Sequence, residues 1–212
     1  MGVPILILGE SGSGKTYSIK NFDPEEVGIF AVEKPNLPFR KQFKVAKNAT
    51  YMMIAEALKE PKLKAYVIDD SQYLLVNELF DRASETGYNK FTEMAKHFRD
   101  LIHIVNHQTP EDCLVYFLHH PEMDAATGRM KAKTVGKMLD EKLTIEGCFN
   151  IVLCTNVESG HYSFITQADG VYPAKSPEEM FEPIIPNDLA AVDAIVRDYY
   201  NFSKLQKEGE KK

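Results

Sequence analysis

The feature that most constrains this chain is the segment GESGSGKT at residues 9–16, which follows the short apolar run VPILIL at residues 3–8. The pattern G-x-x-x-x-G-K-[ST] needs its glycines because the backbone must curl until successive N–H groups point inward at phosphate oxygens. A buried strand precedes the loop, and a helix from about Lys15 to Asn21 follows it, so that the positive helix end faces the same anion. The sequence therefore predicts a phosphate-binding loop between a strand and a helix.

The residues of this loop have separate predicted roles in binding ATP with Mg²⁺. The Lys15 ammonium reaches the β- and γ-phosphates, and the Thr16 hydroxyl is a ligand for Mg²⁺. Asp69 ends the apolar run AYVID and is the predicted carboxylate partner of the metal ion, acting through water. The predicted nucleotide-binding residues are Gly9, Glu10, Ser11, Gly12, Ser13, Gly14, Lys15, Thr16 and Tyr17.

Short apolar runs alternate with segments of helical periodicity along the chain. The further strands are predicted at 27–33, 65–69, 114–119, 149–155 and 162–167, the last as an antiparallel partner of its predecessor. Helices are predicted at 51–59, 71–84, 89–106 and 135–143, with a final helix capped by Asn187. Such alternation predicts an α/β protein with three layers, a mainly parallel sheet, helices on both faces and antiparallel strands toward the C-terminus.

Several polar side chains end the predicted strands, and ligands of open α/β sheets bind beyond these carboxyl ends. Glu33 is the candidate to orient the attacking water, because hydrolysis needs a base on the γ-phosphate side. His119 is a candidate contact for the γ-phosphate. Asp70 either polarises water or lies in a solvated turn. The alternative for His119 and His120 is that both rings only hydrogen-bond to backbone groups. With Lys15 and Asp69, Glu33 and His119 make up the predicted catalytic set.

Length and composition favour one globular domain. The chain has 212 residues, of which 44% are hydrophobic, and its net charge is −6. We expect a single domain at 1–203 and a frayed charged tail at 204–212. No apolar run is long enough to span a membrane, and the three cysteines lack metal-ligand spacing. These features are typical of a cytoplasmic protein with reduced thiols.

Because the chain is acidic overall, any contact with nucleic acid depends on local positive charge. Between Asp124 and Asp140 there is no acid and there are four basic residues: Arg129, Lys131, Lys133 and Lys137. Most of this stretch belongs to a polar loop predicted at 121–134. A second basic run at 34–47 carries Phe39 and Phe43 as possible stacking groups. Either stretch suits a phosphate backbone, and either is equally compatible with a solvated loop.

Together these motifs resemble the RecA-like P-loop ATPases, and most closely the compact RecA-like proteins of bacteriophages, some of which act in single-strand annealing or recombination. The resemblance covers nearly the whole chain. It rests on GESGSGKT, IFAVEK, AYVIDDSQYL, YFLHH and the late stretch YSFITQADGVYPAKSPEEMF followed by IIPNDL. RecA recombinases carry extra terminal regions, so full strand exchange by this chain alone is not expected.

The resemblance implies a RecA-like core with Glu33 as the catalytic glutamate and His119 as a γ-phosphate sensor. Lys175 would contact the nucleotide of a neighbouring subunit. It also implies ATP hydrolysis stimulated by single-stranded DNA, DNA contacts from Arg129, Lys131 and Lys133, and self-association into a ring or filament. Cooperation with a single-strand binding protein and a place in the host cytoplasm are further expectations.

Three alternatives stay open at this stage. A stand-alone nucleotide kinase would suit the length, although such enzymes bring several arginines to the phosphates and the five arginines here are scattered. A GTPase is disfavoured because the segment 89–92, NKFT, lacks the aspartate of the base-recognition motif. A loader or partner protein that only binds ATP is the third. DNA-stimulated hydrolysis would favour the first hypothesis, and phosphate transfer to a nucleoside monophosphate would favour the kinase.

Overall fold

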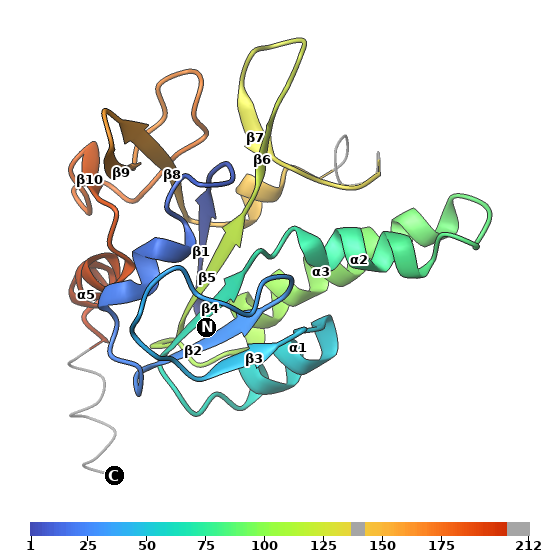
Figure 1. The fold of residues 1–212 in the computed structure, drawn as a ribbon, viewed down its shortest axis with the longest axis horizontal. Coiled ribbons are helices and arrows are strands. Elements are labelled where there is room, and N and C mark those ends of the chain that lie inside the picture. Colours follow the sequence, from blue (N-terminus) through green and yellow to red (C-terminus); the bar gives the residue numbers. More distant parts are fainter. Residues whose placement is uncertain (137–142, 203–212) are drawn as a thin grey trace.

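The computed structural model describes residues 1–136 and 143–202, and in them the chain forms an eight-stranded mixed sheet (Figure 1). The strand order is β10-β9-β8-β1-β5-β4-β2-β3. The strands with parallel neighbours are β1 (Val3–Leu8), β2 (Val27–Ala31), β3 (Val45–Lys47), β4 (Ala65–Asp69), β5 (Leu114–His119) and β8 (Ile151–Glu158). The antiparallel pairs are formed by β9 (His161–Ile165) with β8 and with β10 (Ile184–Pro186). The predicted α/β class, with antiparallel strands toward the C-terminus, is confirmed.

Helices cover both faces of this sheet. One face carries α1 (Tyr51–Lys59), α2 (Tyr73–Asp81) and α3 (Asn89–Gln108), and the other carries η1 (Thr16–Asn21) and α5 (Leu189–Tyr199) (Figure 1). Side chains of β1 alternate between the two cores, because successive residues of a strand point to opposite faces. Burial on both faces explains why these strands are continuous apolar runs in the sequence. None of the described helices is long and apolar enough to cross a membrane.

The segment predicted as a polar loop at 121–134 is instead a hairpin, so that prediction was wrong. Its strands are β6 (Pro121–Met123) and β7 (Met130–Ala132), and it projects from the carboxyl edge of the sheet (Figure 1). The Asp124 carboxylate accepts hydrogen bonds from two backbone N–H groups of the turn, and Gly128 has a positive φ of 67°. A proline at the start and three-residue strands gave the sequence no recognisable alternation.

Two helix predictions also need correction at their ends. The helix after the phosphate loop, η1, is a six-residue 3₁₀ helix that begins at Thr16. The last helix is capped by Asp188, whose Oδ1 accepts from the backbone N–H groups of Ala190 and Ala191 at 3.0 and 3.4 Å, so Asn187 is not its cap. A short 3₁₀ helix, η2 (Ile145–Cys148), precedes β8. Most of the helix predicted at 135–143, and the tail predicted at 204–212, lie outside the described residues.

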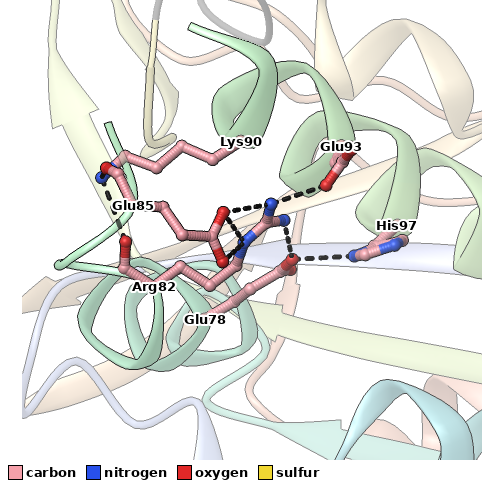
Figure 2. Close-up of polar contacts among 6 residues, drawn as sticks. All are labelled: Glu78, Arg82, Glu85, Lys90, Glu93 and His97. Carbon is pink, nitrogen blue, oxygen red and sulfur yellow. Dashed lines mark hydrogen bonds and ion pairs between the residues drawn. The ribbon is translucent and has the colours of Figure 1, made fainter. Parts of the chain in front are cut away.

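The corner between α2 and α3 is held by an ion-pair cluster centred on Arg82 (Figure 2). The Arg82 guanidinium contacts the carboxylates of Glu78, Glu85 and Glu93 at 3.2, 2.6 and 2.6 Å. His97 of α3 places its Nδ1 2.8 Å from the same Glu78 carboxylate. The cluster therefore joins the end of α2 to two successive turns of α3, away from the phosphate loop.

Candidate phosphate-binding site

The carboxyl end of β1 is a point where the chain changes direction across the sheet. β1 lies between β5 and β8, and the strand that follows it in sequence, β2, lies three places away on the β5 side. Open α/β sheets bind their ligands at such a point. A pocket of about 670 Å³ opens there, and residues 10–12 and 14–17 line one side of it. The structure thus places most of the predicted nucleotide-binding loop, Tyr17 included, on one pocket wall.

Lys15 lies inside this loop and is only 6% exposed. Its Nζ donates hydrogen bonds to the backbone carbonyls of Gly9 at 2.6 Å and Glu10 at 3.0 Å. Burial lowers the pKa of Lys15 to about 8, against the opposing influence of the Asp70 and Asp69 carboxylates. The ammonium is therefore still charged at neutral pH, and it is poorly solvated, which strengthens its attraction for an anion.

Thr16 and Asp69 meet across the pocket although they are 53 residues apart in the sequence. The Thr16 hydroxyl donates to Asp69 Oδ1 at 2.9 Å, which joins the end of the phosphate loop to the end of β4. Asp69 is 3% exposed, and burial together with the neighbouring charge of Asp70 raises its pKa to about 6. A hydroxyl and a carboxylate are oxygen ligands of the kind that Mg²⁺ takes, with phosphate oxygens and water completing its coordination. The predicted metal pair is thus brought together.

Asp70 and His120 form a second polar pair in the same pocket. His120 Nε2 lies 3.3 Å from Asp70 Oδ1, and both residues line the pocket. Burial alone would raise the pKa of Asp70, but the hydrogen bond and charge of His120, with Lys15 and Lys34, outweigh it and lower that pKa. Asp70 also has a positive φ of 59°, which is uncommon for a residue other than glycine.

His119 occupies a different place from the one predicted for a γ-phosphate sensor. Its side chain is fully buried, with Nδ1 3.0 Å from the Ser71 hydroxyl and Nε2 2.8 Å from the backbone carbonyl of Lys133. Burial lowers the pKa of His119 to about 4, so the ring is neutral. Because a carbonyl only accepts, Nε2 carries the proton. His119 therefore holds the base of the β6–β7 hairpin, and His120 is the histidine that faces the pocket.

Glu33 is also separated from the phosphate loop. β2 ends at Ala31, two residues earlier than predicted, and Glu33 is exposed beyond it. Its side chain lines another hollow of about 700 Å³, whose wall includes Tyr51, Glu78 and His97. Among the described residues that line the loop pocket, Glu33 is missing and Lys34 is present. The structure therefore does not bring Glu33 into the pocket beside the phosphate loop.

Other pocket residues were not predicted from the sequence to contact a nucleotide. Lys34 and Asn36 come from the segment after β2, and Gly160 and Tyr162 come from the hairpin between β8 and β9. No short-range pattern marks them, because they reach the site only through the pairing of distant strands. Lys34 adds a second positive charge to the residues that line the pocket.

Lys175 is held beside β8 in this chain. Its backbone forms an isolated antiparallel bridge with Val152, through two hydrogen bonds of 2.8 Å. The side chain is half-buried and is not among the described residues that line the loop pocket.

The predicted DNA-binding residues lie on or beside the β6–β7 hairpin. Arg129 is exposed in its turn, and Lys133 is exposed just after β7 while its backbone carbonyl accepts from His119. Lys131 Nζ lies 3.3 Å from a carboxylate oxygen of Glu122, its cross-strand partner. Lys137 lies outside the described residues. The hairpin thus presents the exposed cations of Arg129 and Lys133 at the same edge of the sheet as the pocket.

No protein-family model and no curated protein matches this chain. Fold and site alone define its class: a mostly parallel α/β protein with a glycine-rich loop at a sheet switch point, a buried lysine in the loop and a buried carboxylate on the strand two places away. Glycine-rich loops of this kind, with a lysine and a carboxylate beside them, are typical of phosphate-binding sites.

Proposed function

We propose that this protein binds and hydrolyses ATP as a RecA-like P-loop protein and acts on single-stranded DNA in phage recombination. The observation that carries the proposal is the convergence of Lys15, Thr16 and Asp69 on one pocket at the carboxyl end of β1. Two of these residues are consecutive in a complete phosphate-loop motif, and the third comes from β4. A fortuitous glycine-rich turn has no reason to meet a buried carboxylate.

In this proposal each group has a defined task. The loop N–H groups bind phosphate oxygens, Lys15 neutralises the β- and γ-phosphates, and Thr16 and Asp69 hold Mg²⁺ directly or through water. The ion supplies charge neutralisation at the transferred phosphoryl group. Lys34, which also lines the pocket, is the proposed contact of the outer phosphate.

Asp70, supported by His120, is the proposed group that orients the attacking water. Its lowered pKa keeps the carboxylate ionised at neutral pH, and it lies in the pocket that Glu33 does not reach. A carboxylate in hydrogen-bond reach of water can align it for in-line attack and accept its proton as the bond to phosphorus forms. His120 fixes the carboxylate through the 3.3 Å contact.

The pocket favours hydrolysis over phosphate transfer between nucleotides. Kinases of nucleoside monophosphates clamp two phosphate groups with several arginines, and none of the described residues that line this pocket is an arginine. Single-stranded DNA is proposed as the partner of the β6–β7 hairpin, since Arg129 and Lys133 offer exposed positive charge beside the site.

The test is the rate of phosphate release from ATP and Mg²⁺, with and without an unstructured single-stranded oligonucleotide. We expect DNA to increase the rate in the wild type, and Lys15→Ala to abolish it. Lys96→Ala, which removes an exposed lysine of α3, is the matched control and keeps the wild-type rate. Equal rates in the wild type and Lys15→Ala would refute ATP hydrolysis at this site.

A further inference from the structure

Two buried polar side chains next to the phosphate loop have no hydrogen-bond partner among the described residues. They are Thr155, in β8, and Asn187, the residue before the cap of α5; they are 7% and 9% exposed. The Thr155 hydroxyl and both polar side-chain atoms of Asn187 are unpaired. Buried polar groups are nearly always paired, because an unpaired one keeps the full cost of desolvation. These two side chains therefore need a physical explanation.

Both side chains lie against the glycines at the two ends of the loop. Leu8 of β1 is in register with Cys154 of β8, so Gly9 and Thr155 are side by side just beyond this pair. A Cβ added to Gly9 would lie 2.1 Å from Thr155 Oγ1. A Cβ added to Gly14 would lie 3.3 Å from Oδ1 and 3.4 Å from Nδ2 of Asn187. The unpaired atoms thus face the backbone of the phosphate loop.

The hydrogen bonds of Lys15 indicate when these atoms become paired. In this structure the Lys15 ammonium donates to the carbonyls of Gly9 and Glu10. The ammonium has three N–H groups, and a triphosphate that draws it off the Gly9 carbonyl leaves this buried oxygen without its lysine donor. The Thr155 hydroxyl lies beside Gly9 and can donate in its place, and the Asn187 amide can both donate to and accept from the backbone near Gly14.

We propose that Thr155 and Asn187 are positioning residues that hydrogen-bond to the phosphate loop when Lys15 turns to a triphosphate. The inference rests on the proposed binding of ATP and adds to it a link between the nucleotide and the C-terminal part of the sheet. Asp188, next to Asn187, caps α5 and accepts a 2.7 Å hydrogen bond from Asn21 of η1. Binding at the loop is thereby transmitted to β8 and to the start of α5.

Isosteric variants separate this role from a structural one. Thr155→Val and Asn187→Leu remove polar atoms that have no partner, so the melting temperature of the protein without nucleotide does not fall. Their affinity for a non-hydrolysable ATP analogue with Mg²⁺ falls roughly three- to tenfold, the equivalent of one hydrogen bond. Thr155→Ser keeps the hydroxyl and restores wild-type affinity. The measurements are isothermal titration calorimetry and thermal unfolding.

Thr166→Val is the matched control, because the Thr166 hydroxyl is buried and already donates to the carbonyl of Glu182 at 2.7 Å. This variant loses thermal stability and keeps its affinity for the analogue. Wild-type affinity in both Thr155→Val and Asn187→Leu, with binding abolished in Lys15→Ala, would overturn the positioning role and leave ATP binding intact. A wild type that does not bind the analogue would overturn both proposals.

Discussion

Raising the pH from 7 to 9.5 is expected to stabilise the wild-type protein relative to a Lys15→Met variant. Burial lowers the pKa of Lys15 to about 8 in the folded protein, whereas its ordinary value of 10.5 applies to the unfolded chain. Above pH 8 the folded protein releases this proton while the unfolded chain keeps it. Stability rises with pH wherever the unfolded state binds more protons, so the lysine becomes less costly to bury as the solution becomes more alkaline.

The size of the effect follows from these two pKa values. Integrated from pH 7 to pH 9.5, the difference in bound protons corresponds to about 2 kcal/mol of unfolding free energy. Methionine has a similar length and no charge, so the variant lacks this contribution. Other groups that titrate over the same range are common to both proteins and cancel in the comparison. Near pH 7 the two curves run parallel, because Lys15 is protonated in both states.

The assay is urea unfolding of both proteins at half-unit steps of pH, with the free energy extrapolated to water. Binding of ATP with Mg²⁺ changes in the opposite direction, since it needs the charged lysine: wild-type affinity falls about 30-fold by pH 9.5. Stability and affinity thus diverge over one pH window. If the unfolding free energies of the wild type and Lys15→Met change in parallel throughout this window, burial does not lower the pKa of Lys15.

Three further outcomes are expected. Asp70→Asn lowers kcat for ATP hydrolysis by about 100-fold or more with little change in ATP affinity, while Glu33→Gln keeps the wild-type rate. Steady-state kinetics give the rates and calorimetry gives the affinities. The reverse pattern would show that Glu33, and not Asp70, orients the attacking water. Arg82→Met lowers the melting temperature, less so in high salt, and leaves ATP affinity unchanged, as thermal melts and titration will show. Arg129→Gln reduces the slope of log affinity for oligo(dT) against log salt by about 0.7, measured by fluorescence anisotropy; an unchanged slope would remove the hairpin from the DNA surface.

The sequence predicted the centre of the fold well, because its strands are buried on both faces. Runs such as 3–8, 65–69 and 114–119 are mostly apolar, and they end before Gly9, at Asp69 and at His119. The structure has strands at these same positions. Prediction failed where an element is short and half-exposed. The β6–β7 hairpin is built from three-residue strands, a length at which neither alternation nor composition separates a strand from a loop.

The site was predictable to the extent that local sequence fixes local geometry. The phosphate loop, Lys15 and Thr16 lie within eight residues, so their arrangement follows from the motif. Which residue near the end of a strand lines the pocket depends on where that strand stops. β2 stops two residues earlier than predicted, and Glu33 lines another hollow. Similarly, adjacent histidines point in opposite directions, and only pairing with the hairpin decides that His119 is the buried one.

Several unfavourable features of the structure converge on the phosphate loop. Lys15 is a buried cation with a lowered pKa, and Asp69 is a buried carboxylate with a raised pKa. Asp70 adopts a left-handed backbone conformation, and Thr155 and Asn187 hold unpaired polar atoms. Strained backbone and shifted pKa values are typical of functional sites. The proposed ligand, a polyphosphate with Mg²⁺, would supply a negative partner for the lysine and a positive one for the carboxylates, so that one ligand would offset costs with different physical origins.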